Sequence, residues 1–131
     1  MSKLKMLNKK VILTTQTPNY YFKNYFSLVD EFYHKNKRLP DQKEKILLEK
    51  KYYKTKKVNS VIINNELKKI SKNTKTKLLE KKKLFCNEKT KRCQFLTDQN
   101  NKIYYDNYHL TIQGAIFIGQ KIFKTGWLEL D

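Results

Sequence analysis

The chain has 131 residues, a length that fits one domain. Lys and Arg number 29 against 12 Asp and Glu, so the formal net charge is +17, while 39% of the residues are apolar. With this many apolar residues the chain can form a core, so its composition is not that of a disordered protein. The three glycines and two prolines are too few for collagen-like or proline-rich segments. The longest apolar runs, such as residues 115–118, are too short to span a bilayer.

The N-terminal third of the chain predicts two helices and one strand. Residues 2–8 fit the end of an amphipathic helix, and residues 11–15 fit a short buried strand. Pro18 cannot continue a central strand, so a loop follows. Apolar and aromatic residues spaced three and four apart predict a helix over 22–36, which Pro40 prevents from continuing.

The middle of the chain predicts two further helices and a second strand. Asp41 can cap a strongly charged helix that runs to about residue 57. Asn59 or Ser60 can cap the next helix, which places apolar residues on one face. Residues 76–79 fit a second buried strand.

The C-terminal segment predicts a hairpin followed by a helix. Residues 94–105 fit a β-hairpin around 98–101, and Thr111 can cap a helix that ends near Lys124. One apolar stripe on this last helix consists of Ile112, Ala115, Ile116, Gly119, Ile122 and Phe123.

This alternation of strands and helices predicts an α/β layer protein with a parallel sheet. Only two segments are convincing sheet strands, whereas a doubly wound domain uses about four or five. We therefore expect an incomplete domain whose missing part lies on the N-terminal side.

Charge is distributed unevenly along the sequence. Residues 35–91 hold 20 cations and 6 anions, whereas residues 93–131 hold 3 cations and 4 anions. A basic chain can bind nucleic acid non-specifically, but Arg38 and Arg92 are the only arginines, and arginine dominates base and phosphate recognition. We expect no specific nucleic-acid partner, and we expect the chemistry in the C-terminal segment.

Asp106 and His109 form the most informative pair in that segment. They lie three residues apart, between an expected strand and the cap of the last helix. A tight turn can bring the carboxylate to the imidazole Nδ1–H, which leaves Nε2 free as a general base.

The segment around this pair resembles the last conserved block of SGNH-type esterases and acyltransferases. It is most similar to the SGNH domain at the C-terminus of acyltransferase-3 membrane proteins, which O-acylate surface polysaccharides. That block reads Tyr-x-Asp-x-x-His-Leu-Ser-x-x-Gly-Ala. The matching residues are Tyr104, Asp106, His109, Leu110, Thr111 (for Ser), Gly114 and Ala115.

Two further features support the resemblance, which covers most of residues 5–125. Residues 10–18 resemble the family's internal strand ending in a Thr-Pro loop. Cys86 and Cys93 resemble a cysteine pair often found before the Asp-x-x-His strand, which implies a disulfide. By themselves the two cysteines fit either a disulfide in an oxidising compartment or free thiols in the cytosol.

The resemblance implies a three-layer α/β/α SGNH fold, similar to flavodoxin, in which Asp106 orients His109 and His109 activates a serine. That serine lies in an N-terminal Gly-Asp-Ser block in the family. None of the four serines here follows Gly-Asp, and the first glycine is Gly114. Residues 1–131 therefore resemble the C-terminal portion of the domain without its nucleophile. We expect the isolated chain to have no esterase or acyltransferase activity.

The resemblance also sets the expected partners. Intact relatives transfer acyl groups, such as acetyl, from a donor to polysaccharide hydroxyls through an acyl-Ser intermediate, beside a membrane acyltransferase segment. No cofactor is expected, and the cysteine spacing does not suit a metal. No export signal is visible, so the chain as written is expected in the cytoplasm, or in the periplasm or at the membrane as the tail of a longer relative. A Lys-rich nucleic-acid-binding protein and a non-catalytic remnant remain the alternatives.

Overall fold

The computed structural model describes residues 10–21, 26–55 and 59–128. Its elements, in chain order, are β1 (Ile12–Thr14), α2 (Leu28–Asn36), α3 (Gln42–Lys54), α4 (Asn59–Thr74), β2 (Lys77–Leu79), α5 (Lys82–Phe85), β3 (Cys86–Asn87), β4 (Arg92–Cys93) and α6 (Ile112–Lys124).

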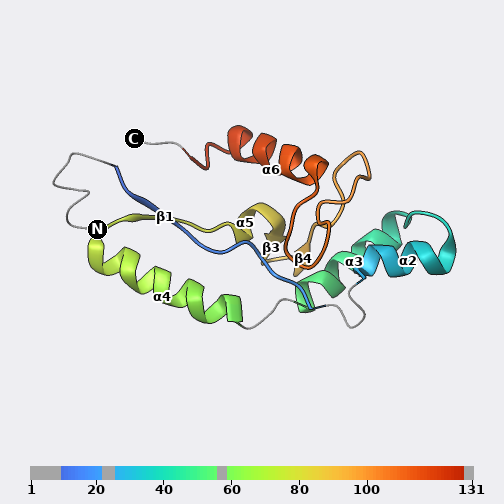
Figure 1. Ribbon diagram of the computed structural model, residues 1–131, viewed down its shortest axis with the longest axis horizontal. Helices are drawn as coiled ribbons and strands as arrows, with labels where there is room; N and C mark the ends of the chain where they lie inside the picture. Colours follow the sequence, from blue (N-terminus) through green and yellow to red (C-terminus); the bar gives the residue numbers. More distant parts are fainter. Residues whose placement is uncertain (1–9, 22–25, 56–58, 129–131) are drawn as a thin grey trace.

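The two longer strands form a parallel pair, as the sequence predicts. β1 and β2 pair in parallel with Leu13 opposite Leu78, and α4 packs against both strands. Figure 1 shows α4 and α6 on opposite sides of this pair. The mixed α/β fold with few, short parallel strands is therefore confirmed. An antiparallel ribbon of β3 and β4 was not predicted.

Capping groups set the starts of α2 and α3. α2 begins at Leu28, because the Ser27 Oγ accepts a hydrogen bond from the Asp30 N–H and caps the helix. Residues 22–25 of the helix predicted over 22–36 lie outside the described residues. Asp41 caps α3 as predicted, and the Glu44 carboxylate accepts from the Asp41 N–H in a reciprocal capping box. α3 ends at Lys54, short of residue 57. The helix predicted over 2–8 lies outside the described residues.

The predicted hairpin over 94–105 is present and forms part of a three-segment antiparallel arrangement. Leu96 pairs with Lys102, and the Ile103 N–H donates to the Phe95 carbonyl at 2.9 Å. On the other side of the same segment, the Thr111 N–H donates to the Ile103 carbonyl at 3.0 Å. Residue 103 is thus hydrogen-bonded on one side to the first arm of the hairpin and on the other to the residue that caps α6.

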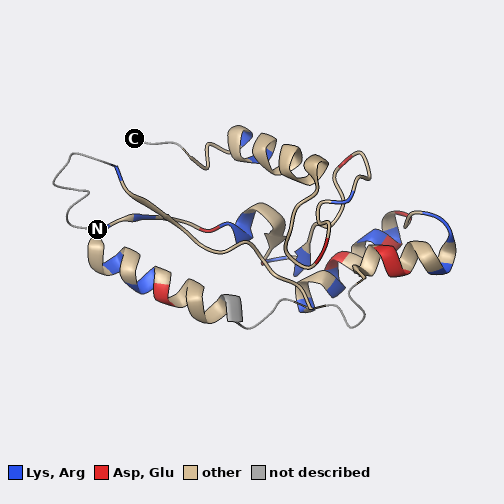
Figure 2. Cartoon of the chain, viewed as in Figure 1, with Lys and Arg blue, Asp and Glu red and all other residues tan. Residues whose placement is uncertain are grey.

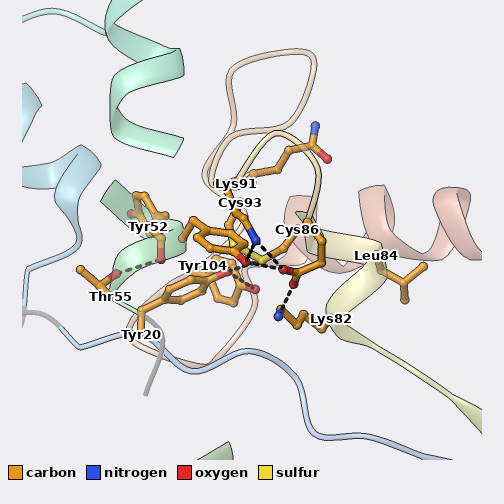
Figure 3. Close-up of a disulfide and its surroundings, with 12 residues drawn as sticks. Tyr20, Tyr52, Thr55, Lys82, Leu84, Cys86, Lys91, Cys93 and Tyr104 are labelled. Carbon is orange, nitrogen blue, oxygen red and sulfur yellow. Dashed lines mark hydrogen bonds and ion pairs between the residues drawn. A yellow bond between two sulfur atoms is a disulfide. The ribbon is translucent and has the colours of Figure 1, made fainter. Parts of the chain in front are cut away.

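Aromatic rings fill the core beside the β3–β4 ribbon. Tyr20 makes edge-to-face contacts with Tyr52 and Tyr104 at ring-centroid distances of 5.2 and 5.0 Å. Tyr52 stacks on Phe95 at 4.9 Å. Figure 3 shows Tyr20 and Tyr104 next to the bond that joins Cys86 to Cys93. Burial raises the pKa of both tyrosines, so their hydroxyl groups stay protonated at neutral pH.

α6 packs against the core through a face beside the apolar stripe predicted from the sequence, and most of that stripe is exposed. Gly114 lies against the backbone of Ile103, where a Cβ would collide with the Ile103 carbonyl. This close approach turns Gly114 and Ile118 towards the core and leaves Ile112, Ile116 and Phe123 exposed. No helix in the described ranges is both long and apolar enough to cross a membrane.

Candidate active site

The loop that carries Asp106 and His109 reverses the chain between two paired segments. Tyr104 pairs with Leu110, and inside that bridge the Tyr105 N–H donates to the His109 carbonyl at 2.7 Å. Thr111 follows immediately, and its hydroxyl accepts from the Gly114 N–H at 2.9 Å to start α6. The loop is therefore fixed at both ends by backbone hydrogen bonds.

Asp106 organises this loop through both of its carboxylate oxygens. Oδ1 accepts from the backbone N–H groups of Tyr108 and His109 at 2.9 and 2.8 Å. Oδ2 lies 2.7 Å from the His109 Nδ1. Burial by itself raises the pKa of Asp106, but these hydrogen bonds outweigh it and lower the pKa to about 2.

The ionisation state of Asp106 decides which nitrogen of His109 carries the proton. A carboxylate at neutral pH can only accept a hydrogen bond, so Nδ1 of the neutral imidazole must be the donor. Nε2 then carries the lone pair. The His109 side chain is 61% exposed, so this nitrogen is accessible to a reacting group. The pair has the geometry of an oriented general base.

Two neighbours of the pair had no role assigned from the sequence. The Tyr108 ring packs against the His109 ring with centroids 4.1 Å apart, and so limits its rotation. The Tyr20 N–H donates to the Asn107 carbonyl at 3.0 Å, which anchors the loop to the segment that follows β1. The adjacency of Tyr108 and His109 could have suggested the first contact, but only the tertiary structure reveals the second.

The other site residues that the sequence singled out lie close to this loop. Cys86 and Cys93 are joined by a disulfide bond across the β3–β4 ribbon. The Tyr20 hydroxyl lies 3.8 Å from the Cys86 Sγ and 3.4 Å from the Tyr104 hydroxyl. Tyr104 in turn precedes the Asp106 loop, so the disulfide supports the loop through one layer of tyrosines (Figure 3).

Two serine side chains that the structure describes, those of Ser27 and Ser71, make hydrogen bonds away from His109. The Ser27 Oγ donates to the Asp30 carboxylate at 2.7 Å, and the Ser71 Oγ donates to the Thr76 carbonyl at 2.6 Å. Ser60 lies in α4, and Ser2 is outside the described residues. Within the part of the chain that the structure describes, no three His, Cys, Asp or Glu side chains gather as metal ligands.

Comparison with known proteins identifies the family and the fold of the chain. A sequence model described as "SGNH domain (fused to AT3 domains)" matches residues 1–124. No curated protein sequence matches the chain. A solved structure with the same fold, the lipopolysaccharide acetyltransferase periplasmic domain of Salmonella ser. Paratyphi A, has a TM-score of 0.64 and 17% identity; the match covers 95% of this chain and 45% of that one. The chain thus spans less than half the length of the solved domain, and it belongs to the family of SGNH domains that are fused to AT3 domains.

Proposed function

We propose that the chain supplies the Asp–His pair of an SGNH acyltransferase domain. The observation that carries this proposal is the 2.7 Å contact between the Asp106 Oδ2 and the His109 Nδ1, with the imidazole exposed. In this proposal the serine that His109 activates lies outside residues 10–21, 26–55 and 59–128.

In the proposed reaction His109 moves a proton at each step. Nε2 takes the proton of the serine hydroxyl while the serine oxygen attacks the acyl carbonyl carbon of the donor. The imidazolium then gives that proton to the leaving group of the donor, and an acyl-serine remains. In the second half, Nε2 takes the proton of an acceptor hydroxyl, the acceptor oxygen attacks the acyl carbon, and the serine oxygen recovers the proton. Asp106 stabilises the imidazolium in both halves.

We infer that the acceptor is a hydroxyl of a cell-surface polysaccharide and that acetyl is the group transferred. The similar solved structure is a periplasmic domain of a lipopolysaccharide acetyltransferase, which supports this choice. The family's fusion to AT3 domains supports a membrane acyltransferase segment as the partner that delivers the acyl group. The disulfide between Cys86 and Cys93 suits the oxidising bacterial periplasm.

The test is the acetyl content of surface polysaccharide in cells that carry the chain. We expect His109→Ala to reduce the acetylation rate about 1,000-fold or more, because removing one member of a catalytic triad has an effect of that order. His34→Ala is the matched control, since this histidine lies on α2, with its ring next to those of Phe26 and Tyr33. Unchanged acetylation with His109→Ala would contradict the proposal.

A further inference from the structure

Two exposed tyrosine side chains lie in the loop that carries His109. Tyr105 is 74% exposed and Tyr108 is 51% exposed, whereas the tyrosines of the core are buried. A single exposed tyrosine is ordinary on a protein surface. Two in one loop with a candidate general base form an aromatic surface at the place where a substrate has to lie.

Backbone pairing places Tyr105 on the same face of the loop as His109. Tyr104 pairs with Leu110 in an antiparallel bridge, so Tyr105 lies opposite His109, and its N–H donates to the His109 carbonyl at 2.7 Å. Opposite residues of an antiparallel pair direct their side chains to the same face, and successive residues alternate between the two faces. Tyr104 is buried, so the Tyr105 and His109 side chains share the exposed face.

Tyr108 is in direct contact with the imidazole. The two ring centroids lie 4.1 Å apart, with the ring planes inclined at 48°. The Tyr108 N–H donates to the Asp106 Oδ1 at 2.9 Å, so the carboxylate that orients His109 also fixes the backbone of Tyr108. A molecule that stacks on the exposed part of the Tyr108 ring therefore lies beside the imidazole.

The surrounding sequence favours a neutral ligand. Among residues 103–120, Asp106 carries the only charge when histidine is counted as neutral, and its carboxylate accepts three hydrogen bonds from the loop itself. Figure 2 shows the same on α6, which has Lys only near its C-terminal end. A phosphate or carboxylate ligand finds no cation in this segment. A sugar ring needs none, because its C–H groups pack on the electron-rich face of an aromatic ring.

We propose that Tyr105 and Tyr108 form the binding subsite for the sugar ring of the acceptor, which stacks on Tyr108 and directs a hydroxyl to His109. This inference rests on the proposed function, which requires a carbohydrate acceptor but assigns no residue that binds it. The two phenolic hydroxyls can hydrogen-bond the sugar hydroxyls at the rim of the stack. Stacking holds the reacting hydroxyl next to the imidazole, which is the orientation that proton transfer to Nε2 requires.

Saturation-transfer NMR with the 131-residue chain tests the subsite. The probe is the surface polysaccharide of cells that carry the chain, with its acetyl groups removed and cut to short oligosaccharides. We expect saturation of C–H protons on one face of a pyranose ring, with equal Kd at about 50 and about 500 mM salt, because stacking does not depend on charge. Absence of binding would overturn the proposal. Binding that disappears at high salt would also do so, because it would place the probe on the basic surface.

Substitutions of the two tyrosines locate the bound sugar. Tyr108→Ala should raise Kd about tenfold and Tyr108→Phe less than about threefold, because the ring face makes the main contact. Tyr105→Ala should raise Kd by at least about threefold. Tyr33→Ala is the matched control, since Tyr33 is comparably exposed at 48% but lies on α2. The proposal is wrong if Tyr108→Ala binds as well as the unchanged chain, or if Tyr33→Ala loses as much.

The Asp106 carboxyl distinguishes sugar binding from mere support of the loop. Its three hydrogen bonds come from two backbone N–H groups and the His109 ring, and none comes from the Tyr108 ring. In Tyr108→Ala we therefore expect the pKa of Asp106 to stay at about 2 while binding is lost. A pKa that returns towards the ordinary 3.8 together with lost binding would show that the ring supports the loop, and would overturn the proposal.

The two proposals fail in different ways. Acetylation that depends on His109, without oligosaccharide binding that depends on Tyr108, would refute the sugar subsite alone. The expected binding together with acetylation that ignores His109 would refute the proposed function alone. Binding is measured without turnover, so the two results are independent.

Discussion

At the scale of single residues, Asp106 holds the candidate site together. One carboxylate accepts three hydrogen bonds, two from backbone N–H groups and one from the His109 ring, all between 2.7 and 2.9 Å. These bonds require the ionised form, which is why they lower the pKa of Asp106. The loop geometry and the tautomer of His109 therefore depend on the same charge.

This dependence predicts an acid transition of the loop. The pKa of Asp106 falls from an ordinary 3.8 to about 2 in the folded chain, so ionised Asp106 stabilises the fold fully above about pH 4. That contribution is lost as the pH falls from about 4 to about 2. We expect the Asp106 carboxyl carbon, followed by NMR, to titrate near pH 2, and the His109 amide resonance to move with it. Asp106→Asn should abolish the amide shift and Asp98→Asn should not; a midpoint near 4 in the unchanged chain would contradict the hydrogen-bond network.

At the scale of elements, the disulfide-bonded ribbon connects distant parts of the chain to the site. β4 packs against α3, where the Arg92 Nε donates to the buried Glu49 carboxylate at 2.7 Å. On the other side, Lys121 of α6 donates to the Leu84 carbonyl and to the Gln94 side chain, both at 2.7 Å. The ribbon thus contacts α3 directly, and the residues that flank it, Leu84 and Gln94, contact α6.

Loss of the disulfide should destabilise this arrangement. The bond closes a loop with a sequence separation of 7 residues, and a loop of that size is worth roughly 2–3 kcal/mol of unfolding free energy in the chain-entropy model. The double variant Cys86→Ala, Cys93→Ala should lose about that amount in urea-induced unfolding. A reducing agent should shift the midpoint of the unchanged chain in the same direction and leave the double variant unaffected. Equal midpoints for the oxidised and reduced chain would show that the bond contributes nothing.

At the scale of the whole molecule, charge and candidate chemistry are separated. Most cations lie in residues 35–91, on and between the helices α2 to α4 and the segment up to β4 (Figure 2). Several of these cations are paired, as in Arg38 with Glu44 and Lys68 with Glu80. The segment that carries Asp106 and His109 has almost no net charge. Nothing in the site therefore requires the basic surface.

The basic surface should bind nucleic acid only through non-specific charge attraction. We expect weak binding to double-stranded DNA at about 50 mM salt that falls by about 1,000-fold at about 200 mM, because counterion release governs such contacts. Fluorescence anisotropy with two unrelated DNA sequences measures both the salt slope and the preference. Binding that survives physiological salt and distinguishes the two sequences would favour the nucleic-acid alternative.

Local patterns were sufficient wherever one segment decides its own structure. Asp41 with Glu44 and Thr111 with Gly114 are caps that need only neighbouring residues, and both were predictable. The start of α2 at Leu28 was not predicted, because the aromatic spacing continues upstream of Ser27 and hides the cap. The β3–β4 ribbon was missed because its strands have only two residues each, too few to show a period.

The α/β class, a parallel pairing of strands and the contact of Asp106 with His109 were all predictable, because they follow from strands that alternate with helices and from a spacing of three residues. The buried face of α6 was not predictable in this way, because it depends on a long-range contact. The contact of Gly114 with Ile103 makes that choice, and it joins residues whose proximity no local pattern encodes. The same contact leaves Ile112, Ile116 and Phe123 on the exposed side of α6.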